Sequence, residues 1–295
     1  MRNRGFRASP VGLAAAPNRA RPDRVVSLVK HEIAEDSHSG RILDLDPDLG
    51  ASISEEDWET ACRACRGALL SVPSGVWELP DAVADRNDVL GLVLVEGALC
   101  REVALRDRYM FELLGRGDVL HVPVAHGGPR LGGKIKLTAL AGTRLVVLDS
   151  AFVRTAARWP SLLANVHRRL EAQREHLAIQ GLIMHLPRAE HRVLLTLWHL
   201  ADRWGRMTPE GTLLPLALTH GLLGHLTAAR RPTVTLAVGT LQTDGYIRRC
   251  NDGSWLLTVA AEHQVRTIAS LTRTPRVLGD AFRVSRGVVD ARRNR

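Results

Sequence analysis

LTHGLLGHLTAARRPTVTLAVGTLQTDGYIRRCNDGSWLLTV, residues 218–259, carries the most specific structural pattern in this chain of 295 residues. Thr219 is a good helix N-cap, and the leucines after it recur at helical spacing, which predicts a short helix. After the small residues Thr227–Ala228–Ala229, apolar residues at helical spacing predict a second helix over Arg231–Thr243, with Asp244–Gly245 as its stop signal. Two short helices around a three-residue turn are the geometry of a helix-turn-helix.

A hairpin of two strands is predicted directly after these helices. Tyr246–Cys250 and Trp255–Val259 alternate between polar and apolar residues, and the polar turn Asn251–Asp252–Gly253 joins them. A further helix over Pro187–Trp204, with Gly205 as its C-cap, and an apolar segment precede the two short helices. The region therefore predicts a winged helix-turn-helix.

Basic and hydroxyl side chains gather at the start of the second short helix and at the root of the hairpin. Arg230 and Arg231 stand where cationic side chains favour a phosphate or a base edge, and Arg248 and Arg249 suit contacts to the DNA backbone. The plain alternative is a peripheral helix pair whose arginines are simply solvated. The ordered series of helix, turn, helix and hairpin favours a DNA-binding set that consists of Thr219, Arg230, Arg231, Pro232, Thr233, Thr235, Leu236, Thr240, Arg248 and Arg249.

A long helix is predicted before the winged helix, from Trp159–Pro160 to Met184. It would run for roughly 35–40 Å, which is longer than a small domain needs for its own core. Its apolar residues form a heptad seam, which predicts a dimer interface made by Leu163, Val166, Leu170, Leu177 and Met184. Gln173 and Gln180 interrupt the second row of the seam, so the alternative is a single helix that lies on its own domain.

The N-terminal half predicts a small jelly-roll barrel that ends where the period becomes helical at Ser150. One helix is expected over Ser54–Arg66, and a short one over Ser150–Arg158. Short apolar runs between Gly, Pro and Asp turns predict eight strands, at Ala68–Val72, Val76–Leu79, Val89–Val95, Cys100–Leu105, Met110–Leu114, Val119–Val124, Lys134–Ala139 and Arg144–Leu148.

The expected fold class is α+β: an N-terminal jelly-roll β-barrel, a long dimerisation helix and a C-terminal winged helix-turn-helix. The expected domains are a disordered basic arm over 1–37, the barrel as a sensor domain over 38–158, the dimerisation helix over 159–185, the winged helix over 186–272 and a basic tail over 273–295.

The net charge of +9 is concentrated at the two ends of the chain. Residues 1–30 carry +6 and residues 273–295 carry +5, which leaves −2 for the rest, so the total charge is poor support for nucleic-acid binding. The sequence has no apolar run long enough to span a membrane and no compact signal peptide, which predicts a cytoplasmic protein without a membrane partner.

The segment LPRAEHRVLLTLWHLADRWGRMTPEGTLLPLALTHGLLGHLTAARRPTVTLAVGTLQTDGYIRR resembles the Crp–Fnr family of transcription regulators, a resemblance that extends over residues 44–259. It implies a bacterial homodimer that binds a palindromic DNA site and that contacts RNA polymerase if it activates. Arg231 matches the family's arginine on the recognition helix. Pro232 and Leu236 replace the next two base-reading positions, so a different target sequence is expected.

The barrel resembles a cyclic-nucleotide-binding domain less closely. Leu114–Asp118 resembles the turn before the family's phosphate-binding cassette, but HVPVAHGGPRLGG lacks the family's Glu, and Leu131 follows Arg130 where the family has Ser or Thr. Cyclic AMP is therefore not the expected effector, and a plain loop is the simpler interpretation. The remaining candidate effector site is an anion cradle formed by Gly127, Gly128, Arg130, Gly132 and Gly133.

Other chemistry has little support in the sequence. Cys62–x–x–Cys65 could bind a metal or be redox-active, but two cysteines on an amphipathic helix are more often packed thiols. His121 and His126 could ligate a haem or a metal, although single histidines in strands are usually just hydrogen-bonded. No metal site and no required cofactor are predicted, and the absence of nucleophile and phosphate-loop motifs predicts a protein that is not an enzyme.

The sequence thus favours a homodimeric, sequence-specific DNA-binding regulator whose effector is unknown. The alternative is a ligand-binding or protein-interaction module whose winged helix docks a protein partner, which the apolar Pro232 and Leu236 favour. A third possibility is a constitutive regulator with an empty barrel.

Overall fold

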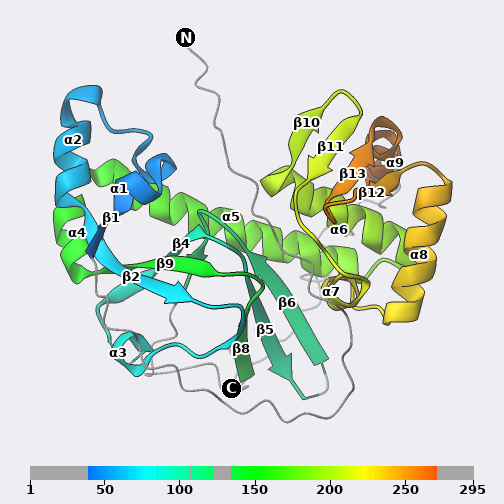
Figure 1. The fold of residues 1–295 in the computed structure, drawn as a ribbon, viewed down its shortest axis with the longest axis horizontal. Helices are drawn as coiled ribbons and strands as arrows, with labels where there is room; N and C mark the ends of the chain where they lie inside the picture. Colours follow the sequence, from blue (N-terminus) through cyan, green and yellow to red (C-terminus); the bar gives the residue numbers. More distant parts are fainter. Residues whose placement is uncertain (1–38, 85, 107, 122–133, 271–295) are drawn as a thin grey trace, which may run out of the picture.

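The computed structural model describes residues 39–84, 86–106, 108–121 and 134–270. A β-rich N-terminal part, one long helix and a smaller α/β part follow one another along the chain (Figure 1). The two predicted basic arms, the predicted anion cradle of Gly127, Gly128, Arg130, Gly132 and Gly133, and His126 lie outside the described residues.

The N-terminal part consists of two antiparallel sheets that face each other across an apolar core. The order of strands is β1-β2-β9-β4-β7 in one sheet and β3-β8-β5-β6 in the other, which confirms the predicted jelly-roll. The strands are β1 Ser39–Arg41, β2 Arg66–Val72, β3 Gly75–Trp77, β4 Val89–Glu96, β5 Leu99–Leu105, β6 Arg108–Leu114, β7 Val119–Leu120, β8 Lys134–Ala139 and β9 Thr143–Asp149.

Short helices close the barrel at its ends. The predicted helix over Ser54–Arg66 is α2 (Glu55–Ala64), and its N-cap is Ser54, whose Oγ accepts a hydrogen bond from the Asp57 amide. The sequence did not predict β1, α1 (Ile42–Leu45), the 3-10 helix η1 (Pro47–Gly50) or α3 (Asp81–Ala84), because none of these elements is longer than one turn or three residues.

Two helices leave the barrel, α4 (Ser150–Ala156) and the long α5 (Pro160–Met184), both close to their predicted positions. One row of α5 is buried against its own barrel, and that row contains three amide side chains. Asn165 Nδ2 donates to the Leu49 carbonyl (2.7 Å), Gln180 Nε2 donates to the Phe111 carbonyl (2.6 Å), and Gln173 Oε1 accepts from the Val119 amide (2.9 Å). Hydrogen bonds to barrel backbone therefore fix the position of α5.

The C-terminal part is a winged helix-turn-helix, as predicted. A four-stranded antiparallel sheet in the order β10-β11-β13-β12 accompanies four helices, whose buried faces share one apolar core. Strand β10 and helix α9 were not predicted. The elements are α6 Ala189–Trp204, β10 Arg206–Thr208, β11 Gly211–Leu214, α7 His220–Leu226, α8 Arg231–Thr243, β12 Ile247–Arg249, β13 Trp255–Thr258 and α9 Val259–Ser270.

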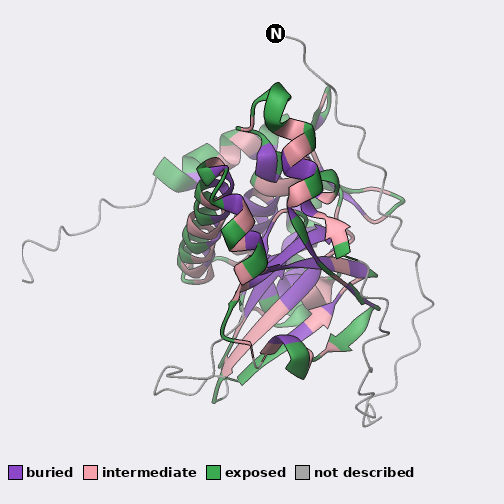
Figure 2. Ribbon diagram, turned by 90° about the vertical axis from the view of Figure 1, so that its left-hand side faces the viewer, coloured by how far each residue is buried: buried purple, intermediate pink, exposed green. Residues whose placement is uncertain are grey.

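The winged helix lies against the barrel as well as against α5. Phe111 and Leu113 of β6 belong to the same apolar cluster as the winged-helix core, and the Phe111 ring lies 4.4 Å from that of His225 in α7. Arg203 of α6 pairs with Asp118, and both side chains are 12% exposed. Figure 2 shows the result, with buried residues along the inner strands and exposed residues on the outer helix surfaces.

The turn Gly115–Asp118 of the barrel packs closely against the C-terminal end of α6. Asp118 also accepts a hydrogen bond from the Gly115 amide (2.7 Å), and Arg203 Nη1 donates to the Leu113 carbonyl (3.3 Å). A Cβ atom at Gly115 would come within 2.8 Å of the Trp204 ring. The barrel and the winged helix are therefore fitted to each other at this turn.

Candidate nucleic-acid interface

Helix α8 has one buried and one exposed face. Val234, Ala237, Val238 and Leu241 are buried in the winged-helix core, as their spacing predicts. The opposite face is exposed. It includes the predicted DNA-binding residues Arg231, Pro232, Thr233, Thr235, Leu236 and Thr240, and also Gly239, Gln242 and Thr243, which were not predicted. Leu236 is 74% exposed. Helix α8 lies at the edge of the molecule, away from the barrel (Figure 1), so this face is open to a large partner.

The first short helix and the turn hold α8 at a close crossing. Thr219 Oγ1 caps α7 by accepting a hydrogen bond from the Leu222 amide (3.2 Å), as predicted. Gly224 is buried where the chain passes back over α7, and a Cβ atom there would lie 2.7 Å from the Ala229 carbonyl oxygen. In the turn between the helices, Ala228 adopts a left-handed conformation with φ of 49°.

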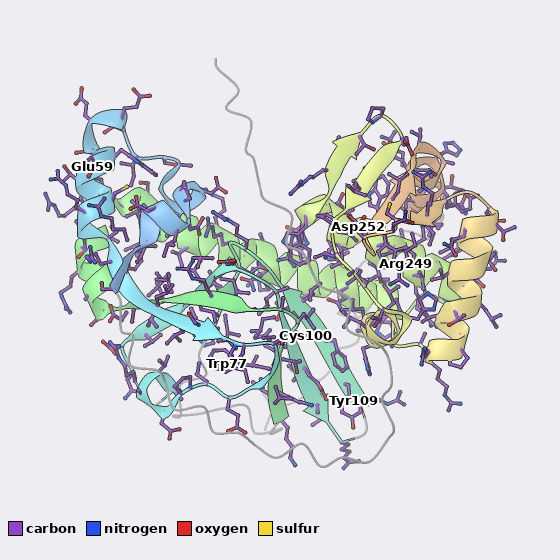
Figure 3. The ribbon with its side chains drawn as sticks, in the orientation of Figure 1. Glu59, Trp77, Cys100, Tyr109, Arg249 and Asp252 are labelled. Atoms are coloured by element: carbon purple, nitrogen blue, oxygen red, sulfur yellow. The ribbon has the colours of Figure 1, made fainter. Side chains whose placement is uncertain are left out.

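The four predicted arginines differ in their surroundings. The guanidinium groups of Arg230 and Arg231 have no ion pair or hydrogen bond with any other described residue, and both residues are exposed. Arg248 pairs with Glu210 on the surface. The guanidinium carbon of Arg249 lies 5.5 Å from the centre of the Trp255 ring (Figure 3). Both residues belong to the hairpin of β12 and β13, which forms the wing. The first two arginines are thus available to an anion without breaking an internal contact.

Thr235 is not as free as the sequence suggested. Its Oγ1 lies 3.0 Å from the Arg231 carbonyl oxygen and 3.0 Å from Nδ1 of His220. His220 was not among the predicted site residues. Its position directly after the N-cap Thr219 was the only signal available, and the contact with Thr235 depends on how α7 and α8 cross.

The predicted dimer seam on α5 divides into two groups. Val166 is 2% exposed and lies in the core of its own subunit, so it has no surface left for a partner. The sequence placed Val166 in the dimer interface because a heptad pattern does not distinguish a helix face that packs on its own domain from one that packs on a second subunit. Leu163, Leu170, Leu177 and Met184 stay partly exposed. On the outer part of the helix, Leu182 is 71% exposed and Ile179 is 38% exposed.

The barrel contains a cavity of about 280 Å³ that is lined by residues of β3, β5 and β8 and by the end of β7. Its walls combine apolar side chains, among them Trp77, with Lys136, Glu78 and Arg101, which pairs with Glu112. His121, which the sequence offered as a ligand of a haem or metal, lies at this cavity. In the described part of the chain, no three His, Cys, Asp or Glu side chains are grouped as a metal ion would need.

Cys62 and Cys65 are free and buried in the apolar core beneath α2. Burial is the main cause that raises the pKa of Cys62 above its usual range and the pKa of Cys65 to about 11. Both thiols stay protonated at neutral pH, which fits packed side chains better than a reactive pair. None of the helices described here combines the length and apolar character that crossing a bilayer requires.

No protein-family profile and no curated protein sequence matches the chain. Solved structures match its fold over most of their length. A mutant of CooA from Carboxydothermus hydrogenoformans is 16% identical with a TM-score of 0.56, and the match covers 76% of this chain and 95% of that one. A cyclic nucleotide-binding domain containing protein from Listeria monocytogenes is 16% identical with a TM-score of 0.54 (72% and 96% covered).

FixK2 from Bradyrhizobium japonicum is similar at a TM-score of 0.50 and 16% identity (70% and 98% covered). The chain therefore has the fold of CRP/FNR-family regulators, and its own barrel, long helix and winged helix follow in this order.

Proposed function

We propose that this protein is a cytoplasmic, homodimeric transcription regulator that binds specific DNA sequences through α8. The observation that carries the proposal is the exposed face of α8. Arg230 and Arg231, whose guanidinium groups have no partner among the described residues, lie at the N-terminus of this helix, and its other face is buried. A helix of this width fits the major groove of duplex DNA, and a two-fold pair of such helices fits two half-sites one helical turn apart.

Base reading by this face would combine one strong polar contact with apolar ones. Arg231 can donate two hydrogen bonds to a guanine, while Pro232 and Leu236 offer only apolar surface, which suits a thymine methyl group. Arg248 lies at the wing, where it would have to exchange Glu210 for a phosphate. We therefore expect a target sequence with guanine and thymine at fixed spacing in each half-site.

Pairing of subunits would use the face of α5 that the barrel leaves open. Leu163 and Leu170 pack partly against the barrel core but keep some exposed surface, as do Leu177 and Met184, and Leu182 adds an exposed apolar side chain. Burial of such a row against a second copy is the usual way in which a helix of this length is stabilised. Sedimentation at several protein concentrations tests the dimer.

The barrel would act as the sensor. Its cavity combines apolar walls with Lys136, Glu78 and Arg101, which pairs with Glu112, so a small polar organic molecule is the first class of effector to test. Thermal unfolding against a panel of nucleotides and organic acids measures this, because a bound ligand raises the unfolding temperature. An unchanged temperature throughout the panel favours a constitutive regulator.

DNA binding is tested by selecting fragments from a genomic library and measuring their affinity in a salt series. Binding through several phosphates has to weaken steeply between about 50 and 200 mM salt. Arg231→Ala should lose about 1–3 kcal/mol of specific affinity and relax the preference at one base pair. Arg266→Ala is the matched control, since Arg266 is an exposed arginine of α9 that pairs with Glu262.

The second candidate is a winged helix that docks a protein. The 74% exposure of Leu236 favours it, because an apolar side chain of this size suits a protein groove as well as a thymine. Binding that hardly changes with salt, together with an Arg231→Ala variant that selects the same fragments with unchanged affinity, contradicts the DNA proposal.

A further inference from the structure

His220 connects the first helix of the helix-turn-helix to the exposed face of the second. Its Nδ1 lies 3.0 Å from Oγ1 of Thr235, and the same Oγ1 lies 3.0 Å from the carbonyl oxygen of Arg231. A carbonyl oxygen can only accept, so the hydroxyl hydrogen of Thr235 is given to Arg231. Nδ1 of His220 must then carry a hydrogen and donate it to Thr235.

The other ring nitrogen of His220, Nε2, is not used in this contact. Nε2 has no hydrogen-bond partner among the described residues and is not buried. With the hydrogen fixed on Nδ1, Nε2 holds a lone pair in the neutral ring and becomes a second N–H donor when the ring takes up a proton. The bond to Thr235 is the same in both states, so protonation adds charge without releasing the ring.

Two arginines from other elements act on this imidazole. Burial first, and then the positive charges of Arg249 on β12 and Arg231 on α8, lower the pKa of His220 below its usual value. These two are the charged groups that act on His220 in the described part of the chain. Side chains from α7, α8 and β12 thus place two fixed positive charges near enough to one titratable group to oppose its protonation.

We propose that His220 and Arg249 together hold one phosphate of the DNA backbone, next to the base that Arg231 reads, and that Nε2 of His220 takes up a proton from water when DNA binds. This inference rests on the proposed function. It gives Thr235 a different role from the predicted one. The hydroxyl group of Thr235 donates to the Arg231 carbonyl and accepts from His220, so Thr235 positions His220 and does not read a base.

The direction of the pH effect follows from the charges. A phosphate beside His220 and Arg249 offsets the repulsion that Arg231 and Arg249 exert on the ring, so the charged imidazole is more stable in the complex than in the free protein. Binding that takes up a proton becomes tighter as the pH falls, by at most about tenfold per pH unit for each histidine involved.

The experiment measures the affinity of the full chain for a labelled duplex of about 30 base pairs and random sequence, by fluorescence anisotropy at pH 8 and pH 6. The dissociation constant of the wild type should fall several-fold at pH 6, and the salt dependence should steepen. His220→Gln should remove both changes and bind at pH 6 as the wild type binds at pH 8. His220→Arg carries a permanent charge and should bind tightly at both pH values.

Two further variants separate the inference from general effects of pH. His263→Gln removes an exposed histidine of α9 and should behave as the wild type. Thr235→Val keeps the shape of the side chain but lacks the hydroxyl, and it should reduce the pH effect without changing sequence preference. A His220→Gln variant with the pH dependence of the wild type overturns the inference. Absence of salt-dependent binding by the wild type at either pH contradicts the proposed function itself.

Discussion

Ala228 adopts a backbone conformation that its own side chain opposes. A left-handed residue with a Cβ atom is less stable by about 1–2 kcal/mol than the same residue in the right-handed region, and glycine avoids this strain. We expect Ala228→Gly to raise the free energy of unfolding by about 0.5–1 kcal/mol, since part of the relief is offset by the greater freedom of glycine in the unfolded chain. Urea unfolding measures the difference. The neighbouring Ala229→Gly, where φ is not positive, should destabilise instead.

The four cysteines should react at very different rates. Cys62, Cys65 and Cys100 are buried, and burial raises the pKa of Cys65 and of Cys100 to about 11. Cys250 is partly exposed. A thiol reagent such as dithionitrobenzoate at neutral pH should therefore modify one thiol per native subunit quickly and the other three only after unfolding. Cys250→Ser should abolish the fast phase. Rapid reaction of two or more thiols would contradict the burial of the pair below α2.

Individual contacts of the candidate site could be predicted only in part. The exposed row of α8 follows from helical spacing, because the positions of Val234 and Leu241 fix which face is buried. The bond between His220 and Thr235 could not be predicted, since it depends on the crossing of two helices that are separate in the sequence. Hydropathy carries no signal for such a contact.

The crossing of α5 and α6 contains a pair of histidines. Nε2 of His199 lies 3.1 Å from the carbonyl oxygen of His176, and the two rings meet edge to face at 4.9 Å. Nδ1 of His176 is buried without a partner among the described residues. Burial, followed by the charges of Arg203 and His199, lowers the pKa of His176 from 6.5 to about 4.

This depressed pKa predicts a loss of stability in acid. The unfolded chain binds the proton near pH 6.5 and the folded chain only near pH 4, so the contribution of neutral His176 is complete above pH 6.5 and declines as the pH falls towards 4. The urea midpoint of the wild type should drop over this range more than that of His176→Gln. His263→Gln should follow the wild type. Parallel curves for the wild type and His176→Gln would show that His176 titrates normally.

Elements differed in how well the sequence predicted them. Strands with clear alternation and helices with caps, such as α2 and α7, lie where expected because their signals are local. The face of α5 that meets the barrel was not predicted. The side chains buried on this face include Asn165, Gln173 and Gln180, which form hydrogen bonds with the backbone of the barrel. A heptad pattern contains only apolar positions, so buried amide side chains interrupt it.

The barrel and the winged helix are joined by a buried ion pair, which makes them one mechanical unit in this arrangement. Removing one partner of such a pair leaves an uncompensated charge, so Arg203→Gln should cost about 3–5 kcal/mol of unfolding free energy. Asp118→Asn combined with Arg203→Gln should recover a large part of this loss, because no charge is then left alone. A double-mutant cycle of urea unfolding measures the coupling. Additive losses would mean that the pair does not hold the two parts together.

In the proposed regulator, a change in the barrel would reach the winged helix through few contacts. Asp118 directly precedes β7 and forms an ion pair with Arg203 of α6. The next residue, Val119 of β7, donates its amide hydrogen to Gln173 of α5. Movement of β7 would therefore change the contacts of both helices at once, which is the kind of element that a two-state switch requires. The overall order of parts was predictable from the sequence, but this docking was not, since it joins residues that are 85 positions apart.

The close fit of Trp204 over Gly115 restricts how such a protein can diversify by recombination. Recombination near Pro187 could replace the winged helix by one from another protein. A residue of another size would then take the place of Trp204 next to Gly115, and it would leave a cavity or clash with the turn. In the proposed regulator, a new DNA specificity would therefore be gained more readily by substitutions on the outer face of α8 than by exchange of whole domains.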